Sequence, residues 1–415
     1  MNNKFYDLPE WLCRGVADIF PVNQQIDSSS SLSQRLIQTK IGSSPLRVKL
    51  GIDPTGSEIH IGHSILFRKL RAFQDAGHTA ILIIGDFTAR IGDPTGKNKT
   101  RLQLSIEEVN EYSKNYLIQL GYGKSSENSL LDFKTPGRLE IHRNSSWLEN
   151  LDLSEIINLM SNITVGQMLA KEDFNNRYVS GTAISLHEFL YPILQAYDSV
   201  AIKADIELGG TDQKFNIAMG RDLQRHLNQK PQFGLLLPIL VGLDGNHKMS
   251  KSLGNVVNIN DDPLTMYSKL EKINDNLVDQ YILLLTQLNL ASLPTDLREK
   301  QLKMALEVTS VFHGPDAAKQ AQIDAKRLVS GFDCSAENII EISLSKTNFP
   351  AKAFYLINNL GFTSTSSEAR RQIKGGAVRL EGNKITDPNI IFDNPDDLVG
   401  KVLQIGKKTF RRLSE

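Results

Sequence analysis

The segment His60-Ile-Gly-His63 carries two imidazoles that are three residues apart. An apolar stretch ends at Ile52 just before it, Pro54 breaks that stretch, and a helical pattern begins at Ile61. Both histidines should therefore lie at the start of a helix, where free backbone N–H groups and the helix dipole favour phosphate. Gly62 would let a flat ligand approach the backbone. A single histidine is more often an ordinary surface or core residue, so the pair needs a partner elsewhere.

A second candidate segment, Lys248-Met-Ser-Lys-Ser252, lies far downstream. Lysines are flexible point charges, which suit phosphates that change position during a reaction. Three nearby glycines would let the loop close over a ligand, and they are Gly242, Gly245 and Gly254. Such a pentapeptide alone is usually a solvated basic loop. Its occurrence together with the histidine pair favours a common phosphate site.

Three polar side chains, Tyr191, Gln195 and Asp198, recur at the spacing of one helical stripe. The alternative is simply a helix with a polar edge, but this composition is unusual for a core face. The segment Gly209-Gly-Thr-Asp-Gln213 follows an apolar strand and places two glycines and two polar side chains at its end. Together they indicate a pocket for a polar substrate.

The segment Asp93-Pro-Thr-Gly-Lys97 could be mistaken for a phosphate-binding P-loop. A P-loop needs glycine, any four residues, and then Gly-Lys followed by serine or threonine. Here Ile91 stands where the first glycine belongs, and Asn98 occupies the last position. We therefore reject the P-loop interpretation.

Strands and helices alternate from Arg47 onward, which predicts an α/β fold with a parallel sheet flanked by helices. Ligands on such sheets bind at the carboxyl ends of the strands, where residues 53–63 and 86–97 fall. Ser105 and Glu108 form a capping box that starts a helix. The elements expected in this part are strands at 48–52, 79–84 and 139–142 and helices at 61–76 and 105–120.

Residues 146–230 are expected to be mostly helical, with a strand near 200–208, and a strand at 235–241 leads into the lysine motif. The end of the chain should hold helices at 350–360 and 367–375 and strands near 377–380, 384–385 and 402–404. We predict five segments, which are a helical lead-in at 1–44, a catalytic domain with an inserted helical segment at 45–261, a helical domain at 262–329, a linker at 330–348 and a small α+β domain at 349–415.

The 415 residues include 47 basic and 47 acidic side chains, so the formal net charge is zero. This balance excludes a uniformly basic nucleic-acid coat but allows a local patch, and residues 349–415 hold 11 basic and 7 acidic side chains. Cys13 and Cys334 are the only cysteines, so neither a disulfide framework nor a structural zinc site is expected. No secretory signal or membrane-length apolar run is visible, and we expect a cytoplasmic protein.

The histidine and lysine motifs together resemble the HIGH and KMSKS signatures of class I aminoacyl-tRNA synthetases. The helix that carries Asp198 and the turn at 209–213 are similar to the tyrosine pocket of tyrosyl-tRNA synthetases of the bacterial KMSKS type. The resemblance runs from about Val48 to Gly254 and resumes in the tail. It implies a Rossmann-like catalytic domain, a helical lobe, activation of tyrosine with ATP, Mg2+ with the phosphates, and a homodimer that charges tRNA(Tyr).

The same resemblance implies roles for particular residues. Those acting on the phosphates would be His60, His63, Lys248, Lys251 and Thr55. Those that otherwise contact ATP would be Gly51, Asp53, Gly62, Gly210, Asp212, Lys97, Arg101 and Ser252. Those holding tyrosine would be Tyr191, Gln195 and Asp93 around its amino group, Asp198 at its phenol and Gln213 along the pocket.

One position departs from the family pattern. Many tyrosyl-tRNA synthetases have a tyrosine two residues before the glycine corresponding to Gly51, and that tyrosine shares the phenol contact. This chain has Lys49 there. The resemblance therefore leaves the second contact to the phenol unassigned.

The tail segment from Ser367 to Val378 resembles a small RNA-binding module shared with a small-subunit ribosomal protein and pseudouridine synthases. By that resemblance, Arg370, Arg371 and Lys374 would bind RNA phosphates and position them rather than read sequence. Taken alone, such a basic cluster is more often an ordinary exposed face.

Three alternatives to a tyrosyl-tRNA synthetase remain at this point. Tryptophanyl enzymes share the core but normally lack this tail and the Gln195 and Asp198 arrangement. A smaller nucleotidyltransferase would not explain the lysine motif or the tail. A non-catalytic RNA-binding paralogue is disfavoured because both motifs are intact.

Overall fold

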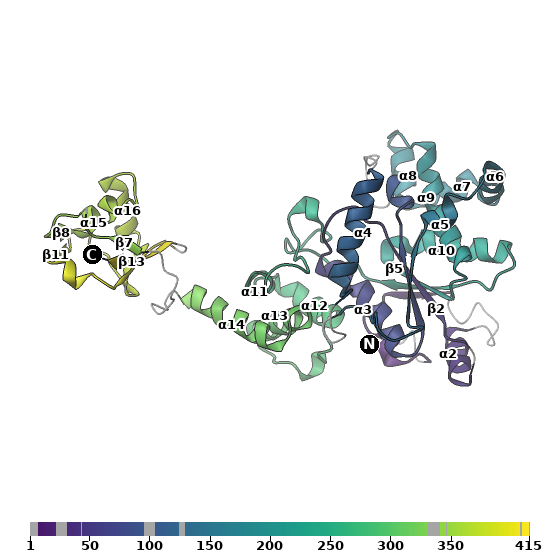
Figure 1. The fold of residues 1–415 in the computed structure, drawn as a ribbon, viewed down its shortest axis with the longest axis horizontal. Coiled ribbons are helices and arrows are strands. Elements are labelled where there is room, and N and C mark those ends of the chain that lie inside the picture. Colours follow the sequence, from purple (N-terminus) through teal and green to yellow (C-terminus); the bar gives the residue numbers. More distant parts are fainter. Residues whose placement is uncertain are drawn as a thin grey trace. The chain divides into compact units, whose positions relative to one another are not determined.

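The computed structural model describes residues 7–21, 31–42, 44–94, 104–123, 129–330, 341–345, 347–406 and 409–414. The chain forms two compact units, Met1–Lys319 and Gln320–Glu415. Figure 1 shows both units, and each is described here by itself. No helix in the described part of the chain combines the length and apolar character that a membrane span requires.

The first unit is built on a six-stranded sheet in the order β1-β6-β5-β2-β3-β4. Five of these strands are parallel, and β1 pairs antiparallel with β6. The strands are β1 (Asp18–Phe20), β2 (Arg47–Ile52), β3 (Thr79–Ile84), β4 (Leu139–Arg143), β5 (Ile206–Gly210) and β6 (Phe233–Leu237). The predicted α/β class with a parallel sheet is confirmed.

Helices surround this sheet (Figure 1). Every residue of β3 is buried, as the apolar run of that strand predicts. The helices of the described part of this unit are α1 (Glu10–Cys13), α2 (Leu32–Lys40), α3 (Ile61–Asp75), α4 (Ile106–Leu120), α5 (Ser145–Leu148), α6 (Leu153–Ser161), α7 (Val165–Leu169), α8 (Glu172–Val179), α9 (Leu190–Ala201), α10 (Lys214–His226), α11 (Pro263–Leu270), α12 (Val278–Leu285) and α13 (Leu297–His313), and α14 (Pro315–Ser330) crosses into the second unit.

Helix α4 begins as its capping box predicts. The Ser105 N–H donates to Glu108 Oε2 at 2.9 Å, and the Glu108 N–H donates to Ser105 Oγ at 3.2 Å. Helix α3 packs against β2, β3 and β5, while α9 and α10 pack on each other and α10 also contacts β5 and β6. Helix α10 therefore lies between α9 and strands β5 and β6 in this set of contacts.

Three expectations about element bounds were wrong. The strand expected at 200–208 is divided, because α9 continues to Ala201 and β5 begins only at Ile206. Short apolar runs fit a buried helix end as well as a strand, so periodicity could not separate them. The strand expected at 235–241 lies at Phe233–Leu237. The N-terminal lead-in is not only helical, because β1 joins the sheet edge.

The second unit contains a five-stranded sheet in the order β10-β9-β12-β13-β7 and a small β11-β8 pair. Its elements are β7 (Glu341–Ser343), β8 (Ala351–Lys352), α15 (Ala353–Asn359), α16 (Ser366–Lys374), β9 (Val378–Leu380), β10 (Asn383–Lys384), β11 (Ile391–Phe392), β12 (Val402–Ile405) and β13 (Thr409–Ser414). Strand β7 lies within the expected linker at 330–348, yet it pairs in parallel with β13. The α+β unit therefore includes residues before 349.

Candidate active site

A cavity of about 640 Å³ lies at the carboxyl ends of β2, β3 and β5. Every residue of the first unit that the sequence placed at the ATP or tyrosine site, and that the structure describes, lines this one cavity. These residues are Gly51, Asp53, Thr55, His60, Gly62, His63, Asp93, Tyr191, Gln195, Asp198, Gly210, Asp212, Gln213, Lys248, Lys251 and Ser252. Lys97 and Arg101 lie outside the described residues.

The two imidazoles lie against each other at the start of α3, with 3.8 Å between their ring centroids. The His60 N–H donates to His63 Nδ1 at 3.3 Å. Burial, the neighbouring His63 and the charge of Lys251 lower the pKa of His60 to about 2. Burial and Lys251 lower the pKa of His63 to about 4. Both rings are therefore neutral near pH 7, and because Nδ1 of His63 accepts, its Nε2 carries the proton and can donate to a ligand.

The histidine turn is held by Gln119, a buried residue of α4 that sequence reasoning missed. Its Oε1 accepts from the Ile59 N–H at 2.8 Å, and its Nε2 donates to the Ser57 carbonyl at 2.9 Å. The only signal for Gln119 in the sequence is that a glutamine occupies a helix position that packs inward. Without the fold, nothing identified the loop it would contact.

The residues that follow the lysine segment are joined to the histidine segment through main-chain hydrogen bonds. The Ile61 N–H donates to the Val257 carbonyl at 2.9 Å, and the Ile259 N–H donates to the Ile59 carbonyl at 3.0 Å. His60 and Asn258 form the antiparallel bridge between them. This pairing places the two motifs on one cavity despite their distance in sequence.

The lysine loop itself is fixed by Asn255, which is also buried. Its Oδ1 accepts from the Ser250 N–H at 2.8 Å, and its Nδ2 donates to the Lys248 carbonyl at 3.2 Å. The Lys251 ammonium lies over the turn that follows β2, where a Cβ added at Gly56 would be 3.2 Å from Nζ. The loop therefore directs a positive charge at the turn that precedes the histidines.

The opposite end of the cavity holds the buried carboxylate of Asp198. Trp147 Nε1 donates to its Oδ1 at 2.8 Å, and Asn144 Nδ2 donates to its Oδ2 at 3.3 Å. Burial raises the pKa of Asp198 to about 6, against the opposing charge of Lys49 and these two hydrogen bonds. Sequence reasoning missed Asn144 and Trp147, because they follow β4 and no motif marks them.

Asp53 and Tyr191, which the sequence assigned to different substrates, contact each other. Tyr191 Oη donates to Asp53 Oδ2 at 2.9 Å, and Thr88 Oγ1 donates to Asp53 Oδ1 at 2.8 Å. A Cβ at Gly85 would lie 2.0 Å from Asp53 Oδ1, so only glycine fits there. Asp53 thus orients the phenol ring of Tyr191 within the cavity.

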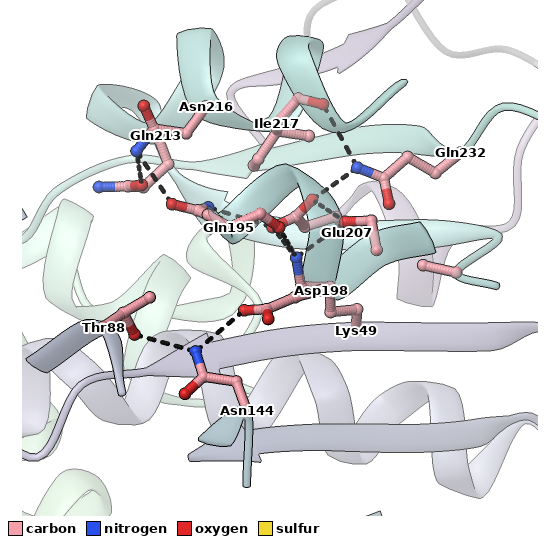
Figure 2. Close-up of polar contacts among 12 residues, drawn as sticks. Lys49, Thr88, Asn144, Gln195, Asp198, Glu207, Gln213, Asn216, Ile217 and Gln232 are labelled. Atoms are coloured by element: carbon pink, nitrogen blue, oxygen red, sulfur yellow. Dashed lines mark hydrogen bonds and ion pairs between the residues drawn. The ribbon is translucent and has the colours of Figure 1, made fainter. Parts of the chain in front are cut away.

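Gln195 and Gln213 are connected through Asn216, which lies on α10 (Figure 2). Asn216 Nδ2 is 3.0 Å from Oε1 of each glutamine. Gln213 Nε2 donates to Asp93 Oδ2 at 2.9 Å, and Lys171 Nζ donates to Asn216 Oδ1 at 3.1 Å. The structure therefore links two of the residues predicted near an amino group, Gln195 and Asp93, with Gln213 in one hydrogen-bonded series, and it adds Asn216 and Lys171. The third, Tyr191, donates to Asp53 instead.

Comparison with known proteins identifies the family of this site. Residues 42–330 match the family model of class I tRNA synthetases for tryptophan and tyrosine, and residues 354–399 match the S4 domain. A tyrosine–tRNA ligase of Prochlorococcus marinus (strain NATL2A) is 66% identical over 414 residues, with 100% of both chains covered. That of Synechococcus elongatus is 60% identical, covering 97% of this chain and 98% of the relative.

The chain belongs to the tyrosine–tRNA ligase family. The fold agrees with this, because a C-terminally truncated mitochondrial tyrosyl-tRNA synthetase of Coccidioides posadasii superposes with a TM-score of 0.58 at 23% identity, covering 76% of this chain and 91% of that one. For a tyrosine–tRNA ligase, the cavity has the expected plan of a cationic, imidazole-bearing end and a carboxylate-bearing end. The alternatives of a smaller nucleotidyltransferase and a non-catalytic paralogue are not supported.

Proposed function

We propose that the protein activates L-tyrosine with ATP to tyrosyl-adenylate and then transfers the tyrosyl group to the 3′ end of tRNA(Tyr), releasing diphosphate and AMP. The observation that carries this proposal is the convergence of His60, His63 and Lys251 on one cavity with Asp198 at its other end. The tyrosine carboxylate attacks the α-phosphorus of ATP, so no side chain has to act as nucleophile. Orientation of the reactants and stabilisation of charge supply the catalysis.

At the ATP end, the neutral imidazoles and the lysine ammonium groups have different roles. We propose that His60 and His63 donate hydrogen bonds to phosphate oxygens, while Lys248 and Lys251 supply the positive charge that accompanies the leaving pyrophosphate. Thr55 would contact the terminal phosphate. The remaining ATP contacts proposed are Gly51, Asp53, Gly62, Gly210, Asp212, Ser252, Lys97 and Arg101.

At the tyrosine end, we propose that Asp198 accepts the phenol hydroxyl. Asp93, Gln195 and Tyr191 would surround the α-ammonium group, and Gln213 would line the pocket. Phenylalanine would leave the buried Asp198 without the hydrogen bond from the phenol, which costs roughly 1–3 kcal/mol or more for a charged group. This cost would exclude phenylalanine without a separate editing site.

Mg2+ would enter with the ATP phosphates. Among the described residues, no three His, Cys, Asp or Glu side chains lie close enough together to hold a metal ion. Mg2+ commonly keeps several water ligands and binds through substrate phosphates, which fits this cavity. When bound, it would neutralise phosphate charge.

The second unit would bind tRNA. Arg370, Arg371 and Lys374 are exposed on α16, and the Arg370 guanidinium stacks 3.7 Å from the ring centroid of Phe354. This stacking holds one cation in place at the helix surface, where it can meet an RNA phosphate. We propose that this cluster positions tRNA(Tyr).

We further propose a cytoplasmic homodimer, since charging tRNA serves protein synthesis there. Exposed apolar side chains support a self-association surface on α6 and α8, and they are Leu153, Ile157, Tyr178 and Val179. Sedimentation velocity should give twice the chain mass, and a monomer at micromolar concentration would contradict the dimer.

The proposed domains are 1–44, 45–261, 262–329, a linker within 330–348 and 349–415, with β7 counted in the last.

Amino-acid-dependent exchange of pyrophosphate into ATP tests the proposed function. Exchange should occur with tyrosine and be negligible with tryptophan. Exchange with tryptophan alone would replace the substrate, and no exchange with either amino acid would contradict the enzymatic proposal.

A further inference from the structure

Lys49 and Glu207, which both line the cavity, form a buried ion pair (Figure 2). Their side chains are 0% and 2% exposed, and Lys49 Nζ lies 2.9 Å from a carboxylate oxygen of Glu207. The two residues are register partners on the adjacent strands β2 and β5. The ammonium also donates to the Gln195 carbonyl and to Ser199 Oγ, both at 2.8 Å. All three of its hydrogens are used within the protein, so Lys49 does not supply the missing phenol contact.

Stability alone does not explain this pair. Two charges lose their hydration on burial, and an apolar pair of similar volume is often at least as stable. Charges do, however, impose a direction on every polar group bonded to them. The neighbouring Gln195 is such a group, and its amide has a donating and an accepting end.

Glu207 fixes the direction of that amide. A carboxylate only accepts hydrogen bonds, so Gln195 must turn its Nε2 toward Glu207 Oε1, at 3.1 Å. Gln195 Oε1 then faces the other way and accepts from Asn216 Nδ2 at 3.0 Å. Lys49, 2.9 Å away, supplies the opposite charge that a buried carboxylate needs.

Lys171, at the other end of this series of hydrogen bonds, imposes the same direction. Lys171 can only donate, so Asn216 presents Oδ1 to Lys171 and Nδ2 to Gln213 Oε1, at 3.1 and 3.0 Å respectively. Gln213 therefore turns its Nε2 to Asp93. As a result, the side-chain oxygens of Gln195 and Gln213 both face Asn216 Nδ2. Each oxygen keeps a second lone pair for a ligand.

We propose that the Lys49–Glu207 pair is a positioning element that directs the oxygen of Gln195, rather than its nitrogen, toward the α-ammonium group of the substrate. This inference rests on the proposed function. A reversed Gln195 would point an NH2 group at the ammonium, which removes a hydrogen bond and adds repulsion. Lys49 and Glu207 thus contribute to recognition of the amino group without touching the substrate.

Two competitive inhibitors separate this role from general support of the pocket. Tyramine carries the phenol and the ammonium, whereas 3-(4-hydroxyphenyl)propanoate carries the phenol and a carboxylate but no ammonium. In the variant Lys49→Met/Glu207→Met, the inhibition constant of tyramine in pyrophosphate exchange should rise about tenfold or more. That of the propanoate should stay within about twofold, because it does not use Gln195 Oε1.

Arg177 and Glu188 provide a matched control, since their side chains are 5% and 4% exposed and neither lines the cavity. Arg177→Met/Glu188→Met should leave the ratio of the two inhibition constants unchanged. Should the first double variant not fold, the near-isosteric Glu207→Gln carries the test, with a smaller change in the same ratio. Equal weakening of both inhibitors, or no change in either, would overturn the inference. Loss of tyrosine-dependent exchange in the wild type would instead contradict the proposed function.

Discussion

At the scale of single residues, the titratable side chains at the two ends of the cavity differ in charge near pH 7. The imidazoles of His60 and His63 are neutral near pH 7, because burial holds the pKa of each well below its usual range. The carboxylate of Asp198 is ionised near pH 7, but burial brings its pKa much closer to neutrality. The two ends should therefore respond differently to acid.

The pH dependence of tyrosine binding follows from this difference. The pKa of Asp198 is raised from 3.8 to about 6, so the carboxylate gains a proton as the pH falls through 6. The KM for tyrosine should rise about tenfold between pH 7.5 and pH 5, as one acceptor is lost. Steady-state exchange at saturating ATP measures this. A KM that is flat over this range, or that rises toward alkaline pH, would contradict the role of Asp198.

Substitution of the same residue tests its part in specificity. Asp198→Ala should reduce the preference for tyrosine over phenylalanine by about 10- to 100-fold in kcat/KM, because the variant has no charged acceptor for the phenol hydroxyl. Glu271→Ala is a suitable control, since Glu271 is buried and paired with Arg298 away from the cavity. An unchanged preference in Asp198→Ala would remove this residue from the phenol site.

Residue types and spacing predicted many of the residues that line the cavity, but not the hydrogen bonds between them. The two motifs and the stripe through Asp198 were recognisable because each has a distinctive local spacing. Asn144 and Trp147 were not, since a lone polar or aromatic residue after a strand resembles many others. The partner of Lys49 could not be found either, because it depends on the register between β2 and β5.

At the scale of elements, local signals placed most helices and strands within a few residues. Capping and periodicity were sufficient for α3, α4, β2 and β3. They failed for β1 and β7, which are only three residues long and exist because a longer partner strand accepts them. The bridge between residues 59–61 and 257–259 also could not be predicted without the fold, because strands β3 to β6 lie between these two segments in the sequence.

The lysine loop offers a test at this scale. Asn255→Ala removes the two hydrogen bonds that fix the loop to Ser250 and Lys248. We expect kcat/KM for ATP to fall about tenfold, while tyrosine binding measured by calorimetry stays unchanged.

Asn289→Ala is the matched control, because Asn289 also caps a short turn but lies away from the cavity. It should leave both quantities unchanged. If Asn255→Ala weakened tyrosine binding as much as ATP use, the loop would not act on the nucleotide alone.

At the scale of the whole molecule, catalysis and RNA binding are expected to be separable. The cavity lies entirely within the first unit, and the S4 match lies entirely within the second. Since β7 pairs with β13, a clean division must precede Glu341. The sequence-based boundary at 349 would leave β7 without its partner strand.

A truncated chain that ends at Ser330 tests this separation. Pyrophosphate exchange should stay within about twofold of the full chain, whereas tRNA charging at limiting tRNA should fall about 100-fold, because the phosphate contacts of the second unit are lost. Charge reversal by Arg370→Glu/Arg371→Glu in the full chain is the matched variant and should reproduce the charging defect. Equal loss of both steps in the truncated chain would contradict the division of roles.

The central claim is that two distant segments act on a single triphosphate. A double-mutant cycle on the rate of tyrosyl-adenylate formation, with His63→Ala, Lys251→Ala and the double variant in single-turnover reactions, tests it most directly. Each single change should slow the step about 100-fold with tyrosine affinity unchanged. The double variant should lose at least about threefold less than the product of the two, since residues that share a partner are coupled. Strictly multiplicative losses, or losses confined to tyrosine binding, would contradict the account.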